Sequence, residues 1–220
     1  KEGIEFIEHG GVKPNPVLSH TREGIEKAKK YKVDAILSVG GGSVIDEGKT
    51  IAVGAKTNKD VWDFFKRDKE IKKALSVYVI LTLAATGSEM NGFAVITNEE
   101  TQEKLSISSE HIFPRVSILN PQLTCTVSAQ YQAYAAVDAI AHVIEHYFTG
   151  SYCPNLQNRF VECLIKTIIE TTETILKESQ NYNARAEFMW SATLALNGLA
   201  RVGIKGGSFP NHMIAHSLGA

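Results

Sequence analysis

The spacing of hydrophobic and polar positions changes near Asn120-Pro121. Before this point, short apolar runs of strand length alternate with helical stretches, which is typical of a mostly parallel sheet with helical layers. We expect strands at Glu5–Ile7, Asp34–Val39, Val77–Leu83, Phe93–Thr97, Lys104–Ser108 and Val116–Leu119. The apolar run DAILSV at 34–39 is typical of a strand that is covered on both faces.

Two helices are expected in this first part of the chain. Ser19 or Thr21 can cap a helix that runs to about Tyr31, and the S-x-x-D pattern at Ser43 predicts a second helix to about Ala55.

From Ser128 onward nearly every segment has the helical period. Gly, Pro and Asn clusters separate helices expected at about 128–148, 156–178, 182–202 and 208–220. The sequence therefore predicts an α/β domain over residues 1–120 and an all-α domain over residues 121–220. A cleft between two such domains is a common ligand site.

Composition narrows the class of protein. The 220 residues are 44% hydrophobic and 21% charged, which is ordinary for a soluble globular chain, and the net charge of -1 favours neither nucleic acid nor an anionic membrane as a partner. Three cysteines without a CxxC pair indicate a reduced, cytoplasmic setting. The chain begins without methionine and stops soon after a candidate functional histidine, so we interpret it as an internal piece of a longer protein.

Two glycine-containing motifs follow predicted strands. Gly40–Gly42 with Ser43 open a helix, so bare backbone N–H groups at the positive end of a helix dipole can meet a pyrophosphate. The alternative is a turn whose glycines only relieve steric strain, and the motif is not G-x-G-x-x-G. The second motif, Thr86-Gly87-Ser88-Glu89, again suits a ligand at the carboxyl edge of a sheet or a simple capped turn.

Candidate metal ligands occur as two pairs with helical i, i+4 spacing. Asp138 and His142 share one helix face, with His146 one turn further on, and His212 and His216 repeat the spacing. Asp138 lies in an apolar, alanine-rich run, and a buried carboxylate there needs a cation or several hydrogen bonds. Carboxylate and imidazole together suit a divalent transition metal. His212 and His216 are either both ligands, or one ligand and one proton shuttle.

Taken together, these motifs resemble the iron-dependent (group III) alcohol dehydrogenase family, and more narrowly its NAD(P)H-dependent butanol dehydrogenase and aldehyde reductase branch. The resemblance covers essentially the whole chain. Its matching stretches are Gly40–Asp46, Ala84–Asn91, Val137–Glu145, Met189–Thr193 and His212–Ala220.

The resemblance implies a Rossmann-like N-terminal dinucleotide-binding domain, similar to that of dehydroquinate synthase, and a helical metal-binding domain. It implies NAD or NADP as cofactor and Fe2+, with Zn2+ as an alternative metal. Asp138, His142 and His212 match three of four metal ligands, and His216 matches a proton relay near the reacting carbonyl, whereas His146 matches no ligand. The residues implied to contact the cofactor are Gly41, Gly42, Ser43, Asp46, Thr82, Thr86, Ser88, Val95 and Lys104.

Relative to that pattern, a first β-α unit would precede Lys1 and the fourth ligand, a histidine, would follow Ala220. The resemblance implies hydride transfer between NAD(P)H and an aldehyde or primary alcohol, in an enzyme that forms a possible homodimer. The alternatives are a glycerol or polyol dehydrogenase on the same scaffold, usually with zinc, and an inactive fragment that keeps partial nucleotide affinity. A lyase of the dehydroquinate synthase type fits the motif spacing poorly.

Overall fold

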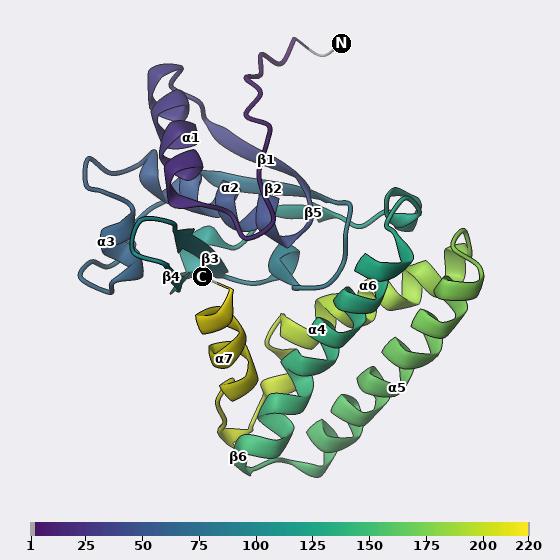
Figure 1. Ribbon diagram of the computed structural model, residues 1–220. Coiled ribbons are helices and arrows are strands. Elements are labelled where there is room, and N and C mark those ends of the chain that lie inside the picture. The colour runs from purple at the N-terminus through teal and green to yellow at the C-terminus, as the bar shows by residue number, and fades with distance from the viewer. Residues whose placement is uncertain (1–2, 220) are drawn as a thin grey trace.

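The computed structural model describes residues 3–219, which form an α/β half and a helical half (Figure 1). In the first half, β1, β2 and β5 form a parallel sheet in the order β1-β2-β5, and β3 and β4 form an antiparallel hairpin. The elements of this half are α1 (Leu18–Lys30), β1 (Ala35–Gly40), α2 (Gly42–Gly54), α3 (Trp62–Phe65), β2 (Ser76–Leu81), η1 (Ser88–Met90), β3 (Phe93–Asn98), β4 (Glu103–Ser108), η2 (Glu110–Ile112) and β5 (Val116–Ile118).

The second half is helical, as the sequence predicts. Helices α4, α5 and α6 pack on one another, and α7 packs against α4 and reaches β4 of the first half. Its elements are η3 (Pro121–Thr124), α4 (Ala129–Thr149), β6 (Gly150–Tyr152), α5 (Asn155–Lys177), α6 (Tyr182–Leu196), η4 (Leu199–Arg201), β7 (Lys205–Gly206) and α7 (Pro210–Leu218). An α/β part with a parallel sheet followed by a helical part confirms the predicted fold class.

One apolar core contains side chains from both halves. The buried side chains of β2, such as Val79 and Leu81, belong to the same cluster as Ala139 of α4 and Phe188 and Met189 of α6. A second core lies between α1, α2, α3 and the β3–β4 hairpin. The halves are also joined by a buried hydrogen bond in which Thr193 Oγ1 of α6 donates to Glu89 Oε1 of η1 at 2.6 Å.

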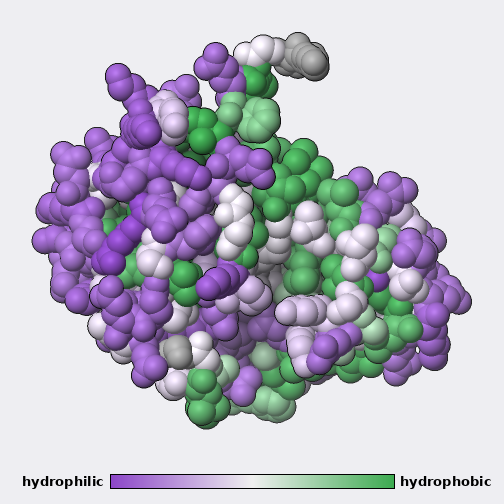
Figure 2. All heavy atoms as spheres, turned by 45° about the horizontal axis from the view of Figure 1, so that its top comes forward, coloured by the Kyte–Doolittle hydropathy of each residue, from purple (hydrophilic) through white to green (hydrophobic). Residues whose placement is uncertain are grey.

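One face of the parallel sheet departs from expectation. The run at 34–39 predicts a strand covered on both faces, but Leu37 and Val39 are exposed, as are Tyr78, Val116 and Ile118 on the neighbouring strands. Within residues 3–219, α2 covers the opposite face, and these apolar side chains are left uncovered. The view in Figure 2 shows hydrophobic side chains gathered near the centre of the molecule.

Three local predictions are wrong for identifiable reasons. Glu5–Ile7 is not a strand, because no strand within residues 3–219 pairs with it. Neither Ser19 nor Thr21 caps α1: Val17 is the N-cap, and Thr21 Oγ1 donates to its carbonyl at 2.9 Å. The helix expected at 182–202 ends at Leu196, where Gly198 takes a positive φ of 99° and a short η4 follows.

Helix α2 carries a lysine with no exposed surface. Lys49 is 0% exposed, and its ammonium donates to Ser88 Oγ at 2.9 Å, to Asn91 O at 2.9 Å and to Phe93 O at 2.8 Å. Burial lowers the pKa of Lys49 to about 8, while Asp46 and Glu89 oppose that shift. The ammonium therefore ties α2 to η1 and to the start of β3.

Across residues 3–219, no helix combines the length and the apolar character that crossing a bilayer requires.

Replacing Lys49 by Met keeps the side-chain volume and removes the charge that faces two buried carboxylates. We expect Lys49→Met to lower the free energy of unfolding by about 3–5 kcal/mol, since one member of a buried charged network is lost. Urea denaturation followed by circular dichroism measures the change. Lys56→Met, at an exposed position just after the same helix, is the matched control and should change stability by less than about 0.5 kcal/mol. Equal stabilities of the two variants would contradict the anchoring role of Lys49.

Candidate active site

The two glycine-containing motifs meet at the carboxyl edge of the sheet. Gly40 and Leu81 are paired at the ends of β1 and β2, and the N–H of Thr82 donates to Gly40 O at 3.0 Å. A Cβ on Gly42 would lie 2.5 Å from Thr86 Oγ1, so only glycine permits this approach of the two loops. This packing alone is enough to require glycine at position 42. It also brings the two glycine-containing motifs together.

The first turn of α2 lies at this same edge and has no side-chain cap. Its N-cap is Gly41, not Ser43, so the S-x-x-D prediction of a Ser43 cap is wrong. Because a glycine cap has no side chain to accept from the first N–H groups, the helix keeps the anion-binding character of a bare N-terminus. Gly41, Gly42, Ser43, Thr82 and Thr86 therefore stand where a pyrophosphate is expected.

Asp46, also expected to contact the cofactor, is hydrogen-bonded to Ser88 and Val95, two other residues of that set. Asp46 Oδ1 accepts from Ser88 Oγ at 2.6 Å, and Asp46 Oδ2 accepts from the N–H of Val95 at 3.0 Å. Burial raises the pKa of Asp46, against the opposing charge of Lys49. These contacts give Asp46 and Ser88 a role in positioning α2 against the hairpin; a direct contact with the cofactor stays a prediction.

Lys104 on β4 interacts electrostatically with Asp46 of α2 and with Asp138 of α4. Its ammonium donates to Asn15 Oδ1 at 2.9 Å. Burial lowers the pKa of Lys104. Asp138 and, to a smaller extent, Asp46 oppose that shift, because both carboxylates attract the ammonium. Lys104 thus connects the two parts of the site electrostatically.

Three of the predicted ligands converge across α4 and α7. The ligand atoms of Asp138, His142 and His212 all lie within 4.8 Å of one another. Asp138 Oδ1 is 4.0 Å from His142 Nε2 and 3.6 Å from His212 Nε2, and the two imidazole rings stack with centroids 4.6 Å apart. The side chain of Asp138 is 38% exposed, so the carboxylate is half-buried where the sequence predicts a buried one.

The charges of this cluster favour cation binding at Asp138 and His142, whereas at His212 a metal ion has to compete with a proton. Burial lowers the pKa of His142 to about 4, so its ring is neutral near pH 7 and keeps a free lone pair. Burial raises the pKa of Asp138, but attraction to His212 and His142 outweighs it and holds the pKa below its ordinary value. Burial also disfavours a charged His212, yet the carboxylates of Asp138 and Glu145 raise its pKa.

Glu145 is a functional candidate for which the sequence predicts no role. One of its oxygens, Oε2, accepts from the N–H groups of Asn211 at 2.8 Å and His212 at 3.4 Å, and the other, Oε1, bonds to His212 Nδ1. The carboxylate thereby caps the first turn of α7 and leaves Nε2 of His212 facing Asp138. A metal-binding histidine whose other nitrogen is held by a carboxylate is a common arrangement in proteins. The spacing of Glu145 and His142, one turn apart on α4, was the available signal.

The other two histidines of these stripes lie outside the group of three. His216 is half-buried on α7, with its ring centroid 6.4 Å from that of His212, and burial followed by Lys104 lowers its pKa. His146 is 2% exposed and packs edge-on against Phe209 with centroids 4.1 Å apart. A relay role for His216 and a bystander role for His146 both stay predictions.

The donor set of Asp138, His142 and His212 fits a divalent transition metal. Bonds of about 2.0–2.2 Å place neighbouring ligand atoms roughly 3.0–3.5 Å apart, so the two distances from Asp138 to the histidines need to contract by at most about 1 Å. Among residues 3–219, Nε2 of His212 has no hydrogen-bond partner, which leaves a lone pair for an ion. A surface hollow of about 690 Å³ lies elsewhere, between α3, the segment after it and β4, so chemistry and not shape identifies the site.

Comparison with known proteins agrees with this geometry. Residues 1–121 match the family model described as iron-containing alcohol dehydrogenase, and residues 132–220 match the model described as the C-terminal part of the Fe-containing alcohol dehydrogenase family. The chain belongs to the iron-containing alcohol dehydrogenase family.

Several individual proteins are similar to the chain over all or nearly all of its length. The chain is 42% identical over its whole length to a probable NADH-dependent butanol dehydrogenase of Bacillus subtilis and covers 57% of that protein. It is 39% identical to the NADPH-dependent aldehyde reductase YqhD of Escherichia coli, again over the whole chain and 57% of the relative. A crystal structure of NADH-dependent butanol dehydrogenase A from Thermotoga maritima superposes with a TM-score of 0.96 at 50% identity, covering 98% of this chain and 54% of that one. The chain thus spans little more than half the length of these relatives.

We expect Glu145→Gln to weaken divalent-metal affinity by about 10–100-fold, because the amide no longer holds His212 as a charged acceptor does. Competition with a chromophoric chelator measures the affinity for Fe2+ or Zn2+ without relying on turnover. Glu170→Gln, an exposed glutamate on α5, should leave the affinity unchanged. An unaltered affinity in Glu145→Gln would show that His212 does not need this partner.

Proposed function

We propose that this protein reversibly reduces an aldehyde to a primary alcohol with a nicotinamide dinucleotide, as a metal-dependent oxidoreductase similar to butanol dehydrogenases. The observation that carries the proposal is the convergence of Asp138, His142 and His212 beside the edge where the two glycine motifs meet. In this proposal, the metal ligands and the anion-binding end of α2 belong to one active site.

The binding roles follow from position. The first turn of α2, with Gly41, Gly42 and Ser43, receives the pyrophosphate of NAD or NADP, and Thr82 and Thr86 extend this surface from the adjacent loop. Val95 and Lys104 of the hairpin line the nicotinamide side. The relatives described above are named for NADH in two cases and NADPH in the third, so we propose a nicotinamide dinucleotide without choosing between the two.

Asp138, His142 and His212 hold the metal, for which we propose Fe2+ from the family and the ligand types, with Zn2+ as the alternative. When bound, such an ion acts as a Lewis acid that stabilises negative charge on the substrate oxygen. His216 of α7, whose ring centroid is 6.4 Å from that of His212, exchanges the alcohol proton with solvent. Lys104 keeps positive charge near the carboxylates of Asp46 and Asp138 and donates to Asn15 Oδ1.

Several wider properties belong to the same proposal. The substrate is a small alcohol or aldehyde, and we propose a cytoplasmic homodimer that needs neither nucleic acid nor a membrane; the unpaired Cys125, Cys153 and Cys163 agree with a reducing compartment. The butanol dehydrogenase and aldehyde reductase names of the relatives favour this substrate class over a glycerol or polyol. Turnover of butanal by the chain would exclude the alternative of an inactive nucleotide-binding fragment.

Removing one ligand tests the metal role. His142→Ala should abolish butanal reduction while NADH binding, measured by fluorescence titration, stays within about twofold, because the nucleotide edge does not contain this residue. Full activity with unchanged metal content would refute the ligand role of His142. His111→Ala, at an exposed histidine of η2, is the matched control and should retain activity.

Removing the relay tests the proton path separately. His216→Ala should lower kcat by about 10²–10⁴-fold, the usual contribution of a positioned acid–base group, with metal content preserved. Added imidazole should restore part of the rate, which a merely structural defect would not allow. A kcat equal to that of the unaltered protein, at every pH measured, would exclude His216 as the relay.

A further inference from the structure

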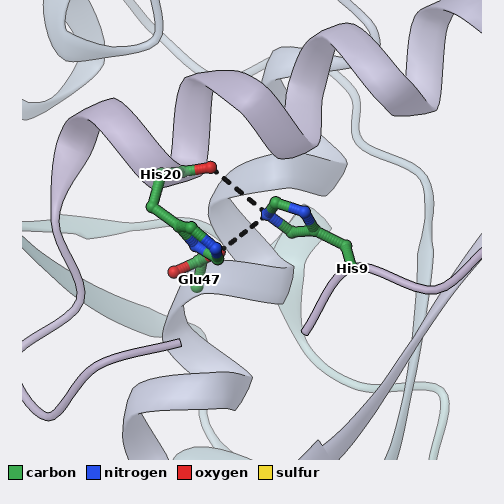
Figure 3. A group of neighbouring side chains, drawn as sticks. All are labelled: His9, His20 and Glu47. Atoms are coloured by element: carbon green, nitrogen blue, oxygen red, sulfur yellow. Dashed lines mark hydrogen bonds and ion pairs between the residues drawn. The ribbon is translucent and has the colours of Figure 1, made fainter. Parts of the chain in front are cut away.

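A second group of potential metal ligands lies on the far side of α2. His9 from the segment before α1, His20 from α1 and Glu47 from α2 point toward one another (Figure 3). Their ligand atoms lie within 4.8 Å of one another, and the two imidazole rings stack with centroids 4.3 Å apart. The neighbouring residue, Asp46, faces the β3–β4 hairpin instead, so two successive carboxylates of α2 serve different surroundings.

The carboxylate of Glu47 lacks a full set of partners. The residue is 1% exposed; its Oε1 is 2.7 Å from His20 Nδ1 and 3.3 Å from His9 Nε2. Within the described residues its other oxygen, Oε2, is buried and has no hydrogen-bond partner. A carboxylate withdrawn from water in this way needs a positive charge close by.

Histidine tautomers alone do not supply that charge. His20 Nδ1 faces Glu47 Oε1, and its Nε2 faces the carbonyl of Gly10 at 3.2 Å, so both nitrogens meet oxygen acceptors. A neutral imidazole carries only one N–H, and the second contact would set a lone pair against an oxygen. His9 Nε2 likewise faces two oxygens, Glu47 Oε1 at 3.3 Å and the carbonyl of His20 at 3.2 Å. A metal ion among the three side chains would supply positive charge next to the buried carboxylate, which neutral imidazoles do not.

The spacing and the chemistry fit a metal ion. Tetrahedral bonds of about 2.0–2.1 Å separate ligand atoms by roughly 3.3 Å, which is the spacing observed between His9 Nε2 and Glu47 Oε1. The shorter pair, His20 and Glu47, needs to open by about 0.6 Å, or the free Oε2 can take the ion. Two imidazoles and one carboxylate suit Zn2+ better than Ca2+ or Mg2+.

Access and local packing agree with this interpretation. The side chains of His9 and His20 are 16% and 22% exposed, so an ion and a water ligand can reach the group from solvent. A Cβ on Gly24 of α1 would lie 2.8 Å from His9 Nε2, which means that His9 approaches the helix where no side chain intervenes.

We propose that His9, His20 and Glu47 form a second divalent-cation site, of the Zn2+ type, separate from the group at Asp138. The ion fastens the segment before α1 to α2, the helix whose first turn carries Gly42 and Ser43. The site is structural: it holds the backbone around Gly10 in place and takes no part in hydride transfer. It stands independently of the proposed function.

The test isolates this site by disabling the other one. In a metal-free Asp138→Ala/His142→Ala protein, isothermal titration with Zn2+ should show one equivalent bound per chain. Adding Glu47→Gln or His20→Ala to that background should weaken the affinity by more than about tenfold, since one of three ligands is lost. Adding His111→Ala, an exposed histidine, should change nothing.

Thermal unfolding gives a second readout in the same background. Zn2+ should raise Tm in the Asp138→Ala/His142→Ala protein and have no effect once His9→Ala is added, a variant in an irregular segment that does not threaten the core. Absence of Zn2+ binding in the two-residue variant overturns the proposal and leaves only the hydrogen-bonded contact between His20 and Glu47. Binding that is equally tight after Glu47→Gln and His9→Ala overturns it as well, because the ion then lies elsewhere.

Discussion

The candidate metal site depends on the bond between Glu145 and the start of α7. Residues of α4 share a face by helical periodicity, so Asp138 and His142 are placed by one element alone. His212 comes from a helix about seventy residues later that has no side-chain cap of its own. Glu145 supplies that cap from α4 and fixes the ring of His212 with the same carboxylate. Without this contact, the third ligand has neither a fixed position nor a fixed tautomer.

Helix α2 is the second element on which the structure depends, because its successive side chains contact different parts of the molecule. Its first turn is bare at the sheet edge, Asp46 binds the hairpin, Glu47 faces the two histidines, and Lys49 is bonded to η1 and β3. Residues one apart on a helix point about 100° apart, so consecutive positions cannot serve one partner. Little of this helix is free to change without altering a contact with another element.

Local periodicity allowed the sequence to predict most elements and the Asp138–His142 pair. The wrong predictions concern properties that depend on which other segment packs against the residues in question. Glu5–Ile7 has strand composition but no strand to pair with, and Ser43 has the cap pattern although Gly41 occupies the cap position. The role of Glu145 depends on where α7 begins, and the uncovered face of Leu37 depends on what packs on the sheet; neither is encoded within a few residues. The repeated i, i+4 spacing indicated that the His212 pair could join Asp138 and His142, and the family resemblance singled out His212 as the ligand.

The apolar core that both halves share restricts how the halves can move to open the site. A hinge rotation of one half against the other would pull Val79 and Leu81 away from Ala139 and expose apolar surface at a large cost in free energy. Helix α7, by contrast, has no buried residue among 210–218 and is held mainly at its first turn. Local opening of α7 would therefore expose less apolar surface than a hinge between the halves, but it would also break the bonds that Glu145 makes to Asn211 and His212.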